Sequence, residues 1–354
     1  MRSAPQGSIP WAQGMVAYEM ATMMAGRNDD LQAVLALLPE VTAAPEAAGW
    51  VALVFLAGVF ISDNLGSFSQ ATALEQPFLA LARERGDQEP LARFWWNISV
   101  GQRASYAHAD PWNAFVHSDA IQPIFDRIGG DLIFLYMQLL RGMNQWYLGA
   151  LAPAVQTLEQ VPATDTTLGE QSSLRRFCLS WLYADRGTLD EARALATQLS
   201  ESSRAHQDRL GEGRGRWALA EVLRRMGDLE AAEREIQVAL AMAVPLEHPG
   251  VLATLSALRL AQGRATEALA AAEDAMSRCA AMGGCGLFRE AFVRLVHAEA
   301  LHETGADDAA RHAITGARAR VLAIADKIPD PGYNASFLED VPENARTLAL
   351  AAAW

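Results

Sequence analysis

A pair of small residues, five positions apart, recurs along this chain of 354 residues at intervals of 36 to 43 residues. A fixed period of this length indicates an array of similar units, each of which buries its apolar face on its neighbours. We therefore expect one elongated core, instead of the two or three separate domains usual for this length. The clear copies of the pair are Gly149/Ala154, Gly187/Ala192, Gly227/Ala232, Gly263/Ala268 and Gly305/Ala310, and the weaker ones are Gly26/Leu31, Gly66/Ala71 and Ala109/Ala114.

The segment 174–200 shows what one unit contains. Apolar residues before Gly187 predict a buried helix, and Arg186-Gly187 ends it because glycine readily adopts the left-handed conformation of helix ends. The residues after Thr188 predict a second helix whose apolar positions share one face. These positions are Ala192, Leu195, Ala196 and Leu199. Because the alternation typical of strands does not occur, the unit is predicted to be an antiparallel helical hairpin.

A second set of small residues stands seven positions before the clear hinge glycines. Small side chains there allow the two helices of a hairpin to approach closely. In the three weaker units the same position holds Glu19, Val59 and Gln102, and Gly58 and Gly101 lie one residue away, which indicates distorted hairpins. The five clear members are Gly142, Ser180, Ala220, Ser256 and Ala298.

This pattern resembles the tetratricopeptide repeat, in which a small residue is followed by glycine after seven positions and by alanine after five more. Tyr183 also stands where that family carries an aromatic residue, four positions before the glycine. The resemblance covers about residues 11–325 and is strongest from 134 onward. It implies an all-α fold: an α-solenoid, a right-handed superhelix of about eight helical hairpins, whose first helices line a concave groove.

The chain is expected to divide by the quality of its repeats. Asp340-Val341-Pro342-Glu343 predicts the start of a final helix, with proline in its first turn. Its residues Leu348, Leu350 and Trp354 are expected to cover the last hairpin, because terminal repeats need a cap. The expected parts are an N-terminal tail (1–10), divergent repeats (11–130), regular repeats (131–326) and a C-terminal linker with the capping helix (327–354).

The two C-terminal stretches 283–301 and 336–354 resemble the end of bacterial multidomain regulators. In those proteins a serine/threonine kinase or ATPase module precedes a tetratricopeptide array. The resemblance implies the sensor or scaffold part of such a regulator, or a stand-alone relative, with a kinase or ATPase module as a possible partner. Lys327, the only lysine, fits neither a P-loop nor a kinase motif, so no such module is expected within this chain.

Charge and composition restrict the partners and the compartment. The formal net charge is −13 and no segment concentrates arginine or lysine as a nucleic-acid-binding arm would, so nucleic acid is an unexpected partner. Residues 1–11 lack a signal-peptide core, and Cys178, Cys279 and Cys285 form no paired motif, which favours a reducing cytoplasm. The apolar run 50–61 has only 12 residues and is expected to form a buried helix, not a membrane span.

Candidate chemical sites fail on their spacing. His297 and His302 flank Glu299, but five residues on a helix rotate by about 140°, so the two rings face different ways and no metal site is expected. No histidine is positioned as a base for Cys279 or Cys285, so the thiols are expected to be structural. Neither a catalytic site nor a cofactor site is predicted.

Two further segments allow more than one interpretation. The glycines of Gly211-Glu-Gly213-Arg-Gly215 follow no strand, so we expect an inter-repeat loop instead of a dinucleotide site. The N-terminal group of Trp11 and several methionines predicts either an ordinary core or a face that adapts to a partner or to a continuing array. The methionines are Met15, Met20, Met23 and Met24.

The concave groove is where binding is expected, because aromatic and arginine side chains are frequent anchors. For each aromatic residue, packing between hairpins remains the alternative. Arg214, Arg216, Arg224 and Arg225 are expected either to grip a carboxylate or phosphate or to form a solvated face. Projection of the family's groove positions selects Arg103, Tyr106, Tyr136, Met143, Trp146, Trp181, Arg214, Trp217, Glu221, Arg224, Glu299 and His302.

The predicted function is non-enzymatic: a scaffold or sensor in bacterial signalling that binds a protein or peptide segment in the groove. One alternative is a stand-alone receptor for a small peptide, of the quorum-sensing type. Another is an accessory factor or enzyme with a site in the groove. Homo-oligomerisation is compatible with all three.

Overall fold

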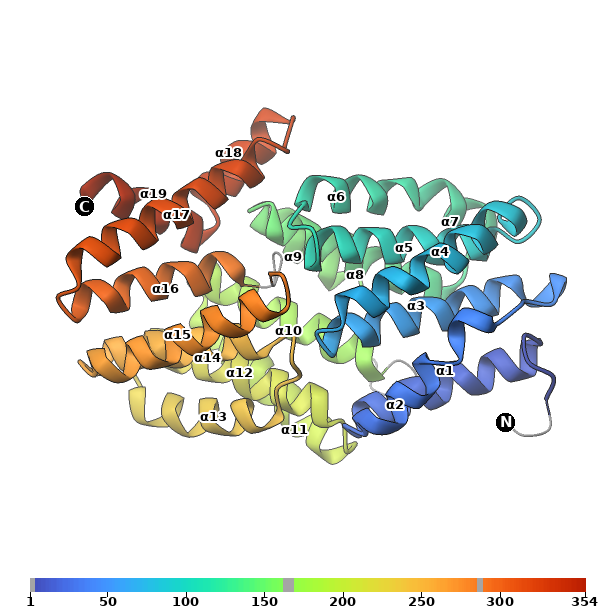
Figure 1. Cartoon of the computed structure of the whole chain (residues 1–354), viewed down its shortest axis with the longest axis horizontal. Helices are drawn as coiled ribbons and strands as arrows, with labels where there is room; N and C mark the ends of the chain where they lie inside the picture. The colour runs from blue at the N-terminus through green and yellow to red at the C-terminus, as the bar shows by residue number, and fades with distance from the viewer. Residues whose placement is uncertain (1–3, 162–168, 285–288) are drawn as a thin grey trace.

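The computed structural model describes residues 4–161, 169–284 and 289–354, and these residues form helices and connecting turns without any β-strand. Helices adjacent in sequence pack as hairpins, and successive hairpins stack along the chain (Figure 1). The N-terminal hairpins are α1 (Ile9–Met24) with α2 (Asn28–Leu35), α3 (Ala48–Asn64) with α4 (Phe68–Arg85), and α5 (Pro90–Tyr106) with α6 (Pro111–Ala120).

A short helix, α7 (Gln122–Ile128), follows the third hairpin, and the array then continues in regular pairs. These pairs are α8 (Asp131–Tyr147) with α9 (Leu151–Glu159), α10 (Gly169–Asp185) with α11 (Leu189–Ala205), α12 (Arg209–Met226) with α13 (Leu229–Met242), α14 (His248–Ala261) with α15 (Ala265–Ala281), and α16 (Glu290–Glu303) with α17 (Asp307–Ala325). Two helices close the chain, α18 (Pro331–Glu339) and α19 (Pro342–Ala353). The predicted all-α solenoid of about eight hairpins with a C-terminal cap is confirmed.

The hinge positions are left-handed, as the sequence predicts. The seven hinge glycines have φ between +69° and +85°, and Ala109, the one non-glycine hinge, has φ +46°. Left-handed backbone ends a helix at one defined residue, and glycine adopts it without strain. The alanine five positions later is fully buried in each of the seven units that carry it, as at Ala192 and Ala232, and Leu31 is 1% exposed.

The small residues seven positions before the hinges lie where paired helices touch. A Cβ atom on Gly142 of α8 would stand only 2.6 Å from Cγ of Leu158 on α9. In α14, Ser256 is fully buried and its Oγ donates a hydrogen bond of 2.9 Å to the carbonyl oxygen of Ala268 on α15. Larger side chains would therefore separate the helices or leave buried polar atoms unpaired.

Glu19 occupies the same position in α1 and departs from this rule. Its side chain is fully buried, and neither carboxylate oxygen has a hydrogen-bond partner. Burial raises the pKa of Glu19 well above its ordinary value, because the low-dielectric interior disfavours the charged form. The first hairpin therefore departs from the repeat pattern at this position.

The apolar run around α3 belongs to the N-terminal core. Pro45–Asn64 is the one segment among the described residues long and apolar enough to cross a membrane, and 83% of its 18-residue apolar window is buried within the fold. It packs against α1, α4 and α5. Trp11, Met15 and Met23 are buried in the same core, so the core interpretation of the N-terminal group applies to them.

The prediction that Gly211, Gly213 and Gly215 form a loop is wrong. All three lie within α12, which begins at Arg209. A Cβ atom on Gly215 would stand 2.6 Å from the backbone nitrogen of Ser200 on α11, and one on Gly213 would stand 3.0 Å from Cβ of Met242. Because these positions lack side chains, the backbone of α12 lies close to α11 and α13, at the usual cost of glycine within a helix.

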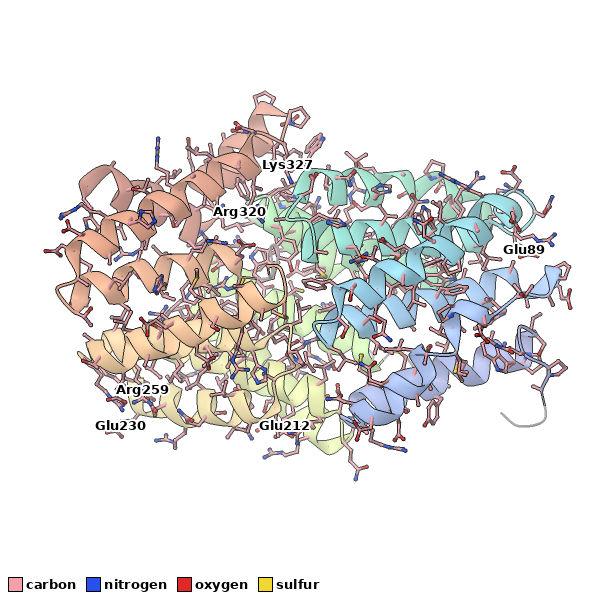
Figure 2. All side chains as sticks on the ribbon, viewed as in Figure 1. Glu89, Glu212, Glu230, Arg259, Arg320 and Lys327 are labelled. Atoms are coloured by element: carbon pink, nitrogen blue, oxygen red, sulfur yellow. The ribbon has the colours of Figure 1, made fainter. Side chains whose placement is uncertain are left out.

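The C-terminal end of the array returns to the third hairpin. Phe115 of α6 and Phe337 of α18 share a small core with Ile324 of α17, and the ring of Tyr333 lies 5.0 Å from that of Phe115. Lys327, which follows α17, donates to the carbonyl oxygen of His108 at 3.3 Å, and Figure 2 shows Lys327 at this boundary. Helix α18 lies in the segment expected to be a linker, and it forms part of this contact.

A second contact joins the second hairpin to the middle of the array. The backbone nitrogen of Leu246 donates to the carbonyl oxygen of Asn64 at 3.1 Å. Arg214 of α12 reaches the side-chain oxygen of Asn64 at 3.5 Å. The superhelix therefore contacts itself across its interior at these and other places, and much of the expected groove is occupied by the protein's own side chains.

We predict that Gly227→Ala and Gly316→Ala have opposite effects. A Cβ atom would meet nothing within 4 Å at either residue, so only the backbone differs. Gly227→Ala should destabilise the fold by about 1–2 kcal/mol through left-handed strain. Gly316→Ala, inside α17, should stabilise it by about 0.5–1 kcal/mol.

Urea denaturation followed by circular dichroism measures both changes in the free energy of unfolding. Equal effects at the two positions would contradict the assigned role of the hinge.

Candidate functional site

Most of the predicted groove residues are packed inside the protein. Trp181 and Trp217 form an edge-to-face pair 5.5 Å apart, and Trp217 donates from Nε1 to Thr254 at 2.9 Å. Met143 and Trp146 belong to the same core, and Tyr136 packs edge-on against Trp95. The side chain of Tyr106 lies outside the described part of the structure.

Three of the predicted residues, Arg224, Glu299 and His302, meet in one open hollow of about 610 Å³. It lies along α12, α14 and α16, which are all first helices of their hairpins, and α19 closes its end. This is an open part of the predicted groove, and we call it the inner hollow. Its lining residues are Arg224, Ala257, Leu260, Ala261, Phe292, Leu295, Val296, Glu299, His302, Glu303, Arg346, Leu350 and Trp354.

The inner hollow has an apolar floor and a charged rim. Phe292, Leu295 and Val296 of α16 are buried beneath it. At the rim Arg346 of α19 forms an ion pair with Glu299. His302, with its side chain 46% exposed, stacks on Trp354 at 4.6 Å and lies 3.1 Å from an oxygen of Asp307. A ligand there meets apolar surface and charges of both signs.

A chain of ion pairs supports Arg224 from below. Glu221 is fully buried and accepts from Arg224 at 2.7 Å and from Arg225 at 2.7 Å. Arg225 continues to Asp185 at 3.0 Å, and Asp185 accepts from Nε1 of Trp146 at 3.0 Å. Burial by itself raises the pKa of Glu221, but attraction to the two arginines prevails and lowers it to about 2.

The other arginines of the predicted cluster also have internal partners. Arg214 is buried and pairs with Glu247 at 2.6 Å, and Arg216 pairs with Glu235 at 2.7 Å. Neither predicted role, binding of an external anion or exposure on a solvated face, applies to Arg214 and Arg216, because carboxylates of the protein itself bind them. Only Arg224 lines the inner hollow.

Arg103 joins the second and third hairpins. It lies 3.3 Å from Asp63 and 2.8 Å from Glu75, and it donates to Thr72 at 3.2 Å. Burial raises the pKa of Asp63 to about 7, although the Arg103 guanidinium opposes the shift. The contacts of Arg103 are thus structural ones.

The described residues contain no cluster of three or more histidine, cysteine, aspartate or glutamate side chains able to hold a metal ion. His302 contacts Asp307, whereas burial lowers the pKa of His297. Burial also raises the pKa of the Cys178 thiol to about 12, far from that of a nucleophile. Cys285 lies outside the described residues.

The projection of repeat positions missed most of the inner hollow. Arg346, Leu350 and Trp354 come from the capping helix, which has no counterpart in the repeat pattern. For Leu350 and Trp354 the sequence predicts only that they cover the last hairpin. Phe292 and Leu295 lie on a helix rich in apolar residues, where composition does not separate floor from core.

No protein-family model and no curated protein sequence matches the chain. Among solved structures it is similar to a Rap protein complexed with Competence and Sporulation Factor, with 11% identity, a TM-score of 0.60 and coverage of 97% of this chain and 98% of that one. It is also similar to the Rap conjugation gene regulator of the plasmid pLS20 in complex with a Phr peptide, with 13% identity, a TM-score of 0.56 and 99% coverage of both chains.

A third similar structure is aspartyl phosphate phosphatase F from Bacillus subtilis, with 8% identity, a TM-score of 0.53 and coverage of 96% of this chain and 92% of that one. At these identities the likeness shows the fold, which for the described residues is that of tetratricopeptide-type helical repeats.

We predict that Glu221→Gln destabilises the protein by about 3–5 kcal/mol, because two partly buried guanidinium groups lose their shared counter-charge. The loss should be full above pH 4.5 and should shrink as the pH falls toward 2, because the lowered pKa makes the ionised carboxylate stabilising only in that range.

Glu201→Gln, on the exposed face of α11, is the matched control and should change stability by no more than about 0.5 kcal/mol. Urea denaturation at pH 7 and at pH 2.5 measures both. If Glu221→Gln behaves like the control at pH 7, the ion-pair chain is not what supports Arg224.

Proposed function

We propose that this chain is a non-enzymatic, peptide-binding regulator of the tetratricopeptide type, acting in the cytoplasm, which holds a partner segment in the inner hollow. The observation that carries the proposal is the hollow itself: about 610 Å³ on the inner faces of three successive hairpins, with an apolar floor and a charged rim. Specific sites combine apolar surface with a few placed polar groups in this way.

An extended segment suits the hollow better than a folded partner domain. The hollow lies between helices, so it admits side chains and a single strand of backbone. Phe292, Leu295 and Trp354 supply apolar area for side chains, whereas Arg224 and Glu303 supply partners for charged groups. Aromatic and arginine side chains dominate binding energy where binding desolvates them fully.

The similar structures support a peptide as the bound segment. Two of them, matched over nearly their whole length, are described as complexes with Competence and Sporulation Factor and with a Phr peptide. This favours, as a second candidate, a stand-alone receptor for a small signalling peptide. A scaffold for a kinase or ATPase module, which the C-terminal resemblance implies, would instead form a lasting complex with that protein.

A substitution that fills the inner hollow should weaken peptide binding without unfolding the protein. Ala261 is the exposed last residue of α14 and lines the hollow. Ala261→Trp places an indole in the space, so we expect binding to weaken at least about tenfold, the loss of roughly 1.4 kcal/mol.

Ala281→Trp is the matched control, because Ala281 is likewise the exposed last residue of its helix, α15, and lies outside the hollow. A synthetic library of short peptides with free carboxyl ends is screened by fluorescence polarisation against the wild type, and its binders are titrated against both variants. Equal affinity for the two variants contradicts the assigned site. A screen without any saturable binder contradicts the proposed function.

A further inference from the structure

A second, smaller cavity lies where the C-terminal helices meet the ends of α8 and α10. It has room for about 50 Å³ and is lined by elements far apart in sequence, from Trp146 on α8 to Asn344 on α19. Arg320 of α17, labelled in Figure 2, is one of its walls. We call this cavity the end pocket.

Arg289 is the residue of the end pocket that most needs an explanation. Its backbone is left-handed, with φ +71°, which is strained for a residue other than glycine. Its guanidinium lies 4.3 Å from the ring centroid of Trp181 and 4.7 Å from that of Phe292. The side chain is only 7% exposed, one terminal nitrogen lies 3.3 Å from Glu343, and Nε has no hydrogen-bond partner.

The charges around the end pocket do not cancel. Arg294 and Arg320 both contact the single buried carboxylate of Glu290, at 2.7 Å and 3.3 Å. Arg289 contacts Glu343, and Asp185 is already paired with Arg225. Three guanidinium groups therefore face two carboxylates, and the remaining single positive charge favours a monoanion over a doubly charged phosphate.

Asn344 offers an unpaired hydrogen-bond acceptor, in addition to the unpaired Nε donor of Arg289. It is buried, and its Nδ2 donates to the carbonyl oxygen of Phe337 at 2.9 Å, which assigns the orientation of the amide. Its Oδ1 has no hydrogen-bond partner. An unpaired buried acceptor is unfavourable, so a ligand that supplies an N–H group to it is stabilised.

We infer that the end pocket binds the carboxyl end of a peptide chain, an inference that rests on the proposed function. The terminal carboxylate accepts from Nε of Arg289, and the N–H group of the terminal residue donates to Oδ1 of Asn344. A volume of about 50 Å³ holds roughly four water-sized groups, which suits a small terminal residue and not a chain passing through. Leu151, Val321 and Ile324 supply the apolar wall beside it.

The end pocket and the inner hollow belong to one inner surface. Asp185 lines the pocket and Arg224 lines the hollow, and the two are joined through Arg225 and Glu221 by contacts of 3.0 and 2.7 Å. Phe292 lines the hollow while its ring contacts Arg289. A peptide with its end at Arg289 thus begins beside the hollow.

The first experiment uses N-acetylglycine, which carries both the carboxylate and the neighbouring N–H group, and N-acetylglycinamide, which lacks the charge. Arginine side-chain Nε–H resonances of the whole ¹⁵N-labelled protein are followed by NMR, with that of Arg289 identified by its loss in Arg289→Gln. N-acetylglycine should shift this resonance saturably, and N-acetylglycinamide should not. Equal shifts with both compounds, or none with N-acetylglycine, overturn the assignment.

Two further variants test the site while leaving Arg289 in place. Ala291→Leu narrows the pocket at a half-buried position and leaves Arg289 in place, so it should abolish the shift. Arg278→Gln removes an exposed arginine of α15 outside the pocket and should leave the shift unchanged. A full response in Ala291→Leu places the carboxylate elsewhere and contradicts the inference.

The second experiment separates a peptide end from a free small carboxylate. A peptide that binds the wild type is compared with the same peptide amidated at its carboxyl end, and amidation should weaken binding about 10- to 100-fold, as expected for a lost hydrogen bond to a charged group. Equal affinities would show that the peptide end lies elsewhere, even if N-acetylglycine binds. That outcome leaves the proposed function standing, whereas the absence of any peptide binder contradicts it.

Discussion

Close contact between paired helices at small, buried residues is the constraint on which this structure depends. A left-handed hinge such as Gly227 ends each first helix, and a fully buried alanine such as Ala232 seats the second helix directly against it. Because the pair repeats, each hairpin meets the next in a similar way, and the sum of these contacts determines the path of the chain. Where the rule fails, as at Glu19, a buried carboxylate is left unpaired.

Local parts of the fold could be predicted because they depend on residues near one another in sequence. The hinge at Gly187 and the face formed by Ala192 and Leu199 follow from helix geometry alone. The contact between Phe115 and Tyr333 could not be predicted, because it depends on the accumulated rotation of many hairpins. The same limit applies to Gly215, whose role within α12 appears only when the neighbouring α11 is in place.

The candidate site was predictable only where the groove stays open. Of the residues that the projection selects, Arg224, Glu299 and His302 line one open hollow. The projection also selected Trp181 and Trp217, which are core residues here. Their side chains point inward in any such solenoid, and whether the interior is filled depends on how tightly the superhelix closes. A binding role for Trp181 and Trp217 stays a prediction.

Buried carboxylates fix the positions of charged side chains on the inner surface. Glu221 and Asp185 hold arginines at fixed positions beneath the open stretch, so a ligand meets groups whose orientation is already determined. Such preorganisation lowers the entropic cost of binding, since fewer side chains must be ordered when the ligand arrives. The strained backbone of Arg289 belongs to the same surface.

Hydroxyl-radical footprinting of the unmodified protein tests most directly whether the interior is filled except for this open stretch. Trp354 lines the inner hollow and is half-buried, whereas Trp181 and Trp217 are each 1% exposed. The structure predicts much faster oxidation of Trp354 than of the other two, as measured by mass spectrometry of the digested protein. Comparable oxidation rates at all three residues would show an open groove along the whole array and would contradict the account.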